Sequence, residues 1–282
     1  MEVKHIFVVG AGTMGHGIAQ TAAISGYAVT MSDVSDEILK RATGAIANSV
    51  EKLEGKGVIT SEQKEAALAI KTAMDLNPAG SADLVIEAAT ENPTLKLELF
   101  SDLDQLAPEH TILSSNTSSI SLTKIAAATK RPDKVVGMHF FNPVPLMKLL
   151  EVIRGLATSD ETTQTVIEVG KQMGKEPVEA QDSPGFISNR ILCPMINEAV
   201  YALQEGIGTA KAIDTVMRLG MNHPMGPLTL ADLIGLDVVL FVLEVLHRDL
   251  GEDKYRPCPL LRKMVDAGYL GRKTGRGFYS YE

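Results

Sequence analysis

A histidine and a glutamate in two successive apolar segments have the types and spacing of an acid–base pair. His139 lies in the run 135–140 and Glu151 in the run 149–153, each six residues from Pro145. If the intervening segment reverses the chain, two antiparallel strands would set these side chains opposite each other, with Cβ atoms about 4.5–5.5 Å apart. A carboxylate bound to one imidazole nitrogen fixes the tautomer and makes the other nitrogen more basic. Such a pair can take the proton of an alcohol while hydride leaves the same carbon.

Glu151 is the more informative member of this pair. It interrupts the apolar sequence Leu-Leu-Glu-Val-Ile, where a carboxylate is costly to bury unless a partner stabilises it. An isolated histidine near a strand end is more often structural than catalytic. The two residues together favour a catalytic dyad, while a structural role for His139 remains the alternative.

A glycine pattern near the N-terminus predicts a dinucleotide site. Gly10, Gly12 and Gly15 have the spacing G-x-G-x-x-G, follow a strand-like run and open a helical segment. The first glycine permits a tight turn, the second lets backbone approach a pyrophosphate, and the third lets helix and sheet pack closely. The helix N-terminus supplies N–H groups for phosphate. Asp33, at the end of the next strand-like run, can bind ribose hydroxyls while repelling a 2′-phosphate, which favours NAD over NADP.

The elements that must position these residues alternate between strand-like and helical patterns. Helical spacing follows the glycines up to Gly26, fills residues 36–72 with a break at Gly55 and Gly57, and returns at 95–106. Strand-like runs are expected at residues 6–9, 28–33, 84–88, 111–113, 135–140 and 149–153. This alternation predicts an α/β fold, a Rossmann-type doubly wound and mostly parallel sheet. Residues just beyond the strands would then lie at the edge where such sheets bind ligands.

The pattern changes after Ser183-Pro-Gly185. From Phe186 onward helical spacing dominates and no clear alternating strand is visible. We therefore expect two domains, a dinucleotide-binding Rossmann domain over residues 1–183 and an all-α C-terminal domain over residues 184–282.

Composition excludes several classes of protein. The net charge of -8, without a Lys/Arg block, gives no electrostatic footprint for nucleic acid. The apolar runs are too short for a signal peptide or a membrane span, so we expect a cytoplasmic protein without a membrane partner. Cys193 and Cys258 lie too far apart for a short-spaced metal motif and do not form a disulfide framework. No ligand cluster is visible, and no metal is expected.

Four motifs together resemble the 3-hydroxyacyl-CoA dehydrogenase family. They are Gly10-Ala-Gly-Thr-Met-Gly15, Ser115-Asn-Thr-Ser-Ser119, His139-Phe-Phe-Asn-Pro-Val-Pro145 and Asp182-Ser-Pro-Gly-Phe186. The likeness continues through Asn189-Arg190, His223-Pro-Met-Gly-Pro227 and the closing segment 271–279, so it covers essentially the whole chain. It implies an NAD-dependent oxidoreductase that interconverts (S)-3-hydroxybutyryl-CoA, or another short 3-hydroxyacyl-CoA, with acetoacetyl-CoA. The greatest likeness is to bacterial members of the family.

The resemblance also implies roles for individual residues. His139 would be the acid/base and Glu151 its partner, while Ser118 and Asn189 would hold the reacting oxygen and contact substrate. The implied cofactor contacts are Gly10, Gly12, Thr13, Met14, Gly15, Asp33, Glu91, Lys96, Asn116, Ser118, Asn142 and Lys273. The implied coenzyme A contacts are Ser49, Lys52 and Lys56. These three share a helical face by their spacing, although an ordinary solvated face is the alternative for the two lysines.

The resemblance further implies a homodimer formed through the C-terminal domain and an active site between the domains, with Asn189 supplied by the helical one. Two other classes of protein remain open. One is a non-catalytic dinucleotide-binding protein of the crystallin type. The other is a dehydrogenase of the 3-hydroxyisobutyrate or 6-phosphogluconate type, which relies on a lysine on a helix instead of a histidine–glutamate pair.

Overall fold

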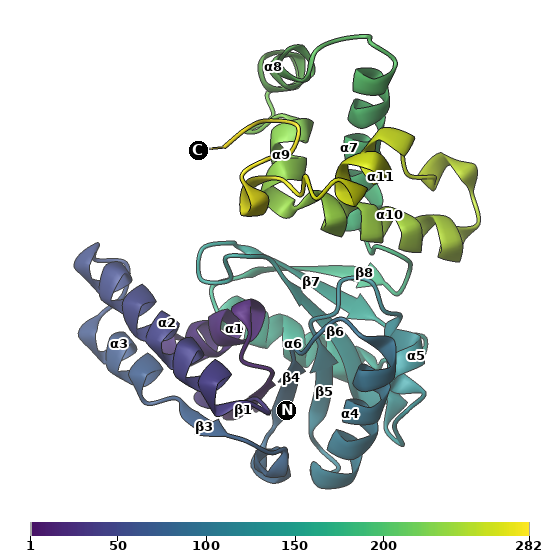
Figure 1. Cartoon of the computed structure of the whole chain (residues 1–282). Coiled ribbons are helices and arrows are strands. Elements are labelled where there is room, and N and C mark those ends of the chain that lie inside the picture. Colours follow the sequence, from purple (N-terminus) through teal and green to yellow (C-terminus); the bar gives the residue numbers. More distant parts are fainter. Residues whose placement is uncertain (1, 282) are drawn as a thin grey trace. The chain divides into compact units, whose positions relative to one another are not determined.

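The computed structural model describes residues 2–281, which fall into two compact units. The first unit ends at Asp182 and the second begins at Ser183. The first contains a sheet with helices around it, and the second is built mainly of helices (Figure 1). In this described part of the chain, no helix is long and apolar enough to cross a membrane.

An eight-stranded sheet forms the centre of the first unit. Its strands are β1 (His5–Val9), β2 (Ala28–Ser32), β3 (Lys71–Ala73), β4 (Leu84–Glu87), β5 (Ile112–Ser115), β6 (Val135–Phe140), β7 (Leu149–Arg154) and β8 (Glu176–Gln181). They are ordered β3-β2-β1-β4-β5-β6-β7-β8, and every neighbouring pair is parallel except β6 and β7. From β1 the chain continues to β2 and β3 toward one edge of the sheet, and from β4 it continues to β5 and β6 toward the other edge, so the strand order reverses between β1 and β4. Doubly wound sheets bind their ligands at the carboxyl ends of strands beside such a point.

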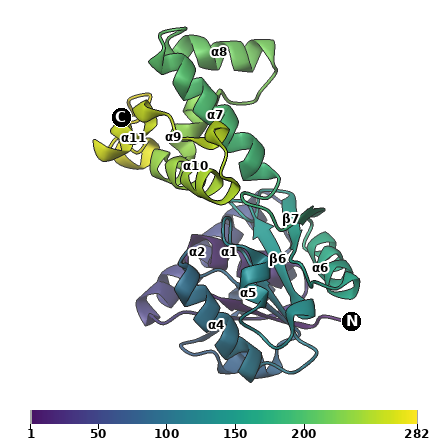
Figure 2. The ribbon, with the colours of Figure 1, turned by 90° about the vertical axis from the view of Figure 1, so that its right-hand side faces the viewer.

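Helices cover both faces of this sheet. Those of the first unit are α1 (Thr13–Ile24), α2 (Asp36–Gly55), α3 (Ser61–Leu68), α4 (Pro93–Leu106), α5 (Leu122–Ala126) and α6 (Asp160–Gln172). Side chains of α1, α2, α3 and α6 share one apolar cluster with the sheet, and α4 and α5 pack on its other face (Figure 2). The sequence-based prediction of a doubly wound α/β domain is therefore confirmed.

The second unit is helical, as its sequence pattern predicts. It contains α7 (Ser188–Gln204), α8 (Ala210–Gly220), α9 (Pro227–Ile234), α10 (Leu236–Leu250) and α11 (Pro259–Asp266). Its apolar core includes Cys193 and Cys258, both free thiols. Burial raises the pKa of Cys193 to about 12, so this thiol is unreactive at neutral pH.

The structure corrects the sequence analysis at both edges of the sheet. The predicted break at Gly55 and Gly57 separates α2 from α3, but residues 71–73 form β3 where the second helical arm was expected to continue to residue 72, and no strand was expected at β8. Both edge strands are mostly exposed and lack a regular apolar alternation. Edge strands have one unpaired side and little burial, so hydrophobic periodicity identifies them poorly.

Candidate active site

The structure places His139 opposite Glu151. The two residues are register partners on the antiparallel strands β6 and β7. The Nδ1 atom of His139 lies 2.7 Å from Oε2 of Glu151, a distance at which the ring donates a hydrogen bond to the carboxylate. The side chains of His139 and Glu151 are 10% and 2% exposed, so the pair is almost removed from water. With Nδ1 held by Glu151, Nε2 is the nitrogen suited to exchange a proton with a substrate.

Strand alternation explains why this pair faces the side of the sheet that carries α5. On β6 the even-numbered residues Val136 and Met138 belong to the cluster under α1 and α6, so the odd-numbered residues point the other way. A Cβ atom on Gly137 would lie 3.2 Å from Leu122 of α5. His139 is two residues further along the same face, at the carboxyl end of the strand.

A carboxylate organises the loop that follows β5 and carries Ser118. Glu91 Oε1 accepts hydrogen bonds from Thr117 Oγ1 at 2.6 Å, Ser118 N at 3.0 Å and Ser119 Oγ at 2.9 Å. Burial raises the pKa of Glu91, but the charge of Lys96 and these hydrogen bonds outweigh burial and leave that pKa below its usual value. Glu91 is therefore ionised at neutral pH and holds the Ser118 loop in one conformation.

Lys96 lies beneath this loop in a buried ion pair. Its ammonium is 2.6 Å from Oε1 of Glu87 and 3.4 Å from Oε2 of Glu91, and its side chain is 1% exposed. Glu87 also accepts a hydrogen bond of 2.6 Å from Ser115 Oγ. Glu87 was not among the site residues predicted from the sequence. The argument made for Glu151, that a buried acid in an apolar strand needs a partner, applies equally to Glu87 at the end of β4.

Asn116 connects the ends of two neighbouring strands. Its Oδ1 accepts a hydrogen bond of 2.8 Å from the backbone N–H of Phe140, the residue after His139. The ring of Phe141 lies 4.7 Å from the His139 ring, centroid to centroid. The carboxyl ends of β5 and β6 are thereby tied together beside the dyad.

The glycine turn opens onto a cavity of about 600 Å³ at the carboxyl ends of β1 and β2. The residues that line it include Gly10, Gly12, Asp33, Met74 and Leu95. The carboxylate of Asp33 accepts a hydrogen bond of 2.9 Å from the N–H of Ala11, so it braces the turn as well as facing the cavity. A mainly apolar cavity with the carboxylate of Asp33 at the end of β2 suits an adenosine whose ribose hydroxyls are recognised.

The three glycines of the G-x-G-x-x-G turn provide the close backbone packing and the open space that a bound dinucleotide requires. A Cβ atom on Gly10 would lie 2.7 Å from the carbonyl oxygen of Ala88, and one on Gly15 would lie 1.8 Å from that of Gly10. At Gly12 an added Cβ would meet nothing within 4 Å, so space for a pyrophosphate lies beside the backbone. Helix α1 starts at Thr13 without a side-chain cap on its N–H groups. The turn thus fits the phosphates of NAD.

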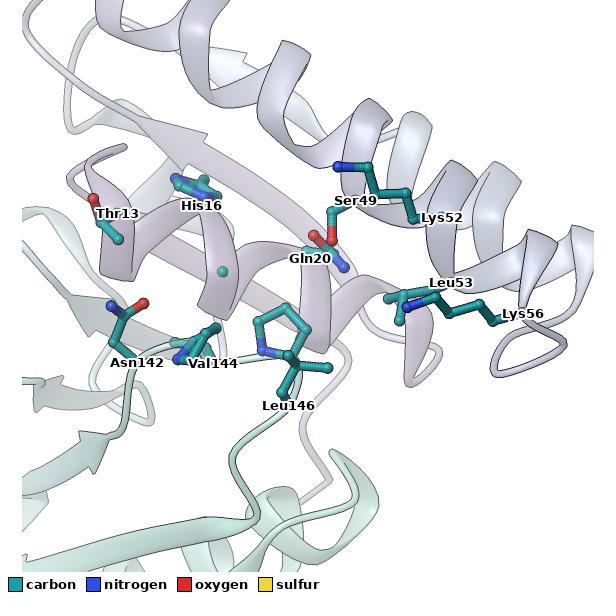
Figure 3. Close-up of a pocket in the computed structure, with 13 residues that line it drawn as sticks. Thr13, His16, Gln20, Ser49, Lys52, Leu53, Lys56, Asn142, Val144 and Leu146 are labelled. Atoms are coloured by element: carbon teal, nitrogen blue, oxygen red, sulfur yellow. The ribbon is translucent and has the colours of Figure 1, made fainter. Parts of the chain in front are cut away.

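A second cavity, of about 260 Å³, lies between α1, α2 and the turn after β6 (Figure 3). Ser49, Lys52 and Lys56 all line it, so the structure brings together the three residues expected to contact coenzyme A. Helix α2 ends at Gly55, and Lys56 is its C-terminal cap. Thr13 and Asn142, two expected cofactor contacts, line the same cavity.

Lys175 holds the turn that forms one wall of this second cavity. Its ammonium, on a residue that is 9% exposed, donates hydrogen bonds to the carbonyl oxygens of Val144 and Met147. Burial lowers the pKa of Lys175. Lys175 was not predicted from the sequence, because its partners are backbone atoms of a turn about 30 residues away, which leave no side-chain signature.

Two expected site residues belong to the second unit. Asn189 lies in the first turn of α7. The ammonium of Lys273 is 2.6 Å from the carboxylate of Asp237, and both side chains are partly exposed.

A further expected cofactor contact, Met14, lies in the first unit, in the first turn of α1, and is partly buried. Within residues 2–281, no group of three or more His, Cys, Asp or Glu side chains could hold a metal ion.

Two family models together match nearly the whole chain. The NAD-binding domain of 3-hydroxyacyl-CoA dehydrogenase matches residues 5–183, and the C-terminal domain of the same family matches residues 185–281. The chain belongs to the 3-hydroxyacyl-CoA dehydrogenase family, and its first unit is an NAD-binding domain. It is an NAD-dependent enzyme of this class.

Its relatives narrow the class further. The chain is 58% identical over 286 residues to a probable 3-hydroxybutyryl-CoA dehydrogenase of Bacillus subtilis, covering 100% of this chain and 99% of the relative. It is 50% identical to 3-hydroxybutyryl-CoA dehydrogenase of Bradyrhizobium diazoefficiens, covering 99% and 96%. The crystal structure of (S)-3-hydroxybutyryl-CoA dehydrogenase from Ralstonia eutropha matches with a TM-score of 0.97 and 51% identity over the full length of both chains.

Proposed function

We propose that this protein interconverts (S)-3-hydroxybutyryl-CoA and acetoacetyl-CoA, with His139 as the proton-transfer residue and Glu151 as its partner. The observation that carries the proposal is the buried hydrogen bond of 2.7 Å between Nδ1 of His139 and the carboxylate of Glu151. The names of relatives support the substrate, and the NAD-binding domain supports hydride exchange with a nicotinamide cofactor.

The residues divide the work as follows. In oxidation, Nε2 of His139 takes the proton of the C3 hydroxyl, and Glu151 stabilises the imidazolium that forms. In reduction, the same nitrogen returns the proton to the forming alkoxide. NAD bound at the Gly10–Gly15 turn supplies the hydride acceptor, and NADH the donor. Ser118, held by Glu91, and Asn189 orient the reacting oxygen by hydrogen bonds.

The remaining assignments concern binding. Asp33 recognises the adenine ribose, while Asn116 and Asn142 help to place the cofactor near the dyad. Ser49, Lys52 and Lys56 bind coenzyme A, whose phosphates suit the two lysines. Lys96 contributes to cofactor binding by fixing Glu91, because its own ammonium is buried in the ion pair with Glu87 and Glu91. Lys273 is a further proposed cofactor contact, and the functional form is proposed to be a homodimer through the helical domain.

One assay tests this function. The purified protein, NADH and acetoacetyl-CoA are mixed, and NADH absorbance is followed, with free acetoacetate as a parallel substrate. We expect rapid oxidation of NADH with the thioester and little with the free acid. No turnover with acetoacetyl-CoA or longer 3-ketoacyl-CoA thioesters would favour a non-catalytic dinucleotide-binding protein. A preference for free acids would favour the hydroxyisobutyrate type.

A further inference from the structure

Gln20 is buried at the cavity between α1 and α2 with a hydrogen-bond donor left unsatisfied. The residue is 1% exposed, and its Nε2 has no hydrogen-bond partner within residues 2–281. An amide group buried without a partner destabilises a folded protein, so such groups are rare unless a ligand satisfies them. Gln20 lines the same cavity as Ser49 and Lys52.

The position of Gln20 within this cavity indicates which part of a ligand it meets. Figure 3 shows Gln20 on α1 beside Ser49 of α2, with Thr13 and Asn142 toward one end and Lys56 toward the other. Asn142 is three residues after His139 in the chain, so the end of the cavity at Asn142 is the end nearer the dyad in the sequence. Lys56 lies at the opposite end, and the ammonium of Lys52 lies beside Ser49 on α2 (Figure 3). Gln20 lies between the Asn142 end and the Lys56 end of the cavity.

The lining has the chemistry of a chain that alternates polar and apolar parts. Apolar groups come from Leu53, Val144 and the two prolines of the turn, and polar groups come from Gln20 and Ser49. The pantetheine arm of coenzyme A carries two amide groups on an aliphatic chain, with a thioester at one end and phosphates at the other. With the phosphates at Lys52 and Lys56, the amides fall in the middle of the cavity.

We infer that the side-chain amide of Gln20 donates a hydrogen bond to a pantetheine amide carbonyl of the bound acyl-CoA, and so serves as a substrate-binding residue. This inference rests on the proposed function, since it requires a CoA thioester as substrate. Binding of the arm supplies the partner that the ligand-free protein lacks.

The test compares Gln20→Leu and Gln20→Met with the wild type by calorimetric titration of free coenzyme A and, separately, of NADH. Loss of one hydrogen bond to an uncharged group should weaken coenzyme A binding about three- to tenfold. The KM for acetoacetyl-CoA should rise by the same factor with kcat little changed. Affinity for NADH should stay as in the wild type. The melting temperature without ligand should be unchanged or higher, because an unsatisfied donor has been removed.

A matched control is Gln105→Leu, since Gln105 lies on α4, is exposed and bonds only its own helix. It should leave both affinities unchanged. Unaltered coenzyme A affinity in both Gln20 variants, or an equal loss for coenzyme A and NADH, would overturn the inference. Failure of both variants to fold would also contradict it, because the amide would then support the fold. If the wild type itself neither binds coenzyme A nor reduces acetoacetyl-CoA, it is the proposed function that fails.

Discussion

At the scale of single residues, the chemistry depends on two side chains that strand register sets opposite each other. His139 and Glu151 need no long side chains to meet, because β6 and β7 bring their backbones into direct register. Each also makes the burial of the other acceptable: a carboxylate that is 2% exposed is destabilising without a cationic or hydrogen-bonding partner. Positioning and electrostatics are thus provided by one hydrogen bond.

Glu151→Gln separates the charge of this partner from its shape. The amide can still accept a hydrogen bond from Nδ1 but does not stabilise an imidazolium, so kcat should fall about 10- to 100-fold, the value of one hydrogen bond to a charged group. Affinity for NADH should be unchanged, because Glu151 does not line the cavity at the glycine turn. Steady-state kinetics and fluorescence titration of NADH measure both. Wild-type turnover in this variant would show that the charge is dispensable.

At the scale of elements, the loop after β5 is ordered by an acid that follows β4. Glu91 binds three consecutive residues of that loop, and Lys96 fixes Glu91 and Glu87 together. The loop that carries Ser118 is therefore held by hydrogen bonds to an ionised carboxylate and by an ion pair, not by apolar packing alone. This arrangement makes its order dependent on pH.

Glu91→Gln should loosen the loop and lower turnover several-fold at pH 7. The pKa of Glu91 is depressed in the folded protein relative to its ordinary value near 4.5. Its contribution to stability is therefore fully present above that ordinary value and is lost as pH falls through the lower, folded pKa. Urea unfolding should show the wild type more stable than the variant at pH 7, with the gap closing as pH falls below 4.5. A gap independent of pH would contradict this role.

The sequence predicted the elements of the inner sheet better than those at its edges. Buried strands such as β1, β4 and β6 are continuous apolar runs, and glycine spacing marked the turn after β1. The sequence could predict that His139 and Glu151 face each other, because the buried acid in one strand needs a partner and the histidine in the neighbouring strand supplies one in a single register. Lys175 and Gln20 could not be anticipated, since one binds backbone oxygens of a distant turn and the other is defined by a partner it lacks.

At the scale of the whole molecule, the last described segment of the chain is anchored to the second unit mainly by a buried carboxylate, Asp232. Asp232 is 1% exposed and accepts hydrogen bonds from Phe278 N at 2.9 Å, Tyr279 N at 3.0 Å and the Tyr281 hydroxyl at 2.9 Å. A Cβ atom on Gly277 would lie 1.9 Å from its Oδ1, so the chain passes very close to it. Asp232 thus binds three residues of this segment, and Asp214 binds the Tyr279 hydroxyl as well, at 2.8 Å.

Asp232→Asn should destabilise the second unit. The NH₂ group of asparagine would face N–H donors, and the charge that strengthens the remaining bonds would be lost, at a cost of about 2–3 kcal/mol. Urea unfolding measures the loss, and hydrogen exchange should be faster at Phe278 and Tyr279. Asp249→Asn, at a partly exposed residue paired with Arg248, is the control and should have little effect. Equal stability of the two variants would show that Asp232 does not anchor the segment.

The most direct test of the central claim is the turnover of His139→Gln with acetoacetyl-CoA and NADH, measured beside His110→Gln, a replacement of an exposed histidine in the same unit. If His139 transfers the proton, its variant should lose about 100- to 10,000-fold in kcat, while NADH affinity and melting temperature stay near those of the wild type. His110→Gln should retain wild-type turnover. A folded His139→Gln protein that binds NADH and still turns over at close to the wild-type rate would contradict the account.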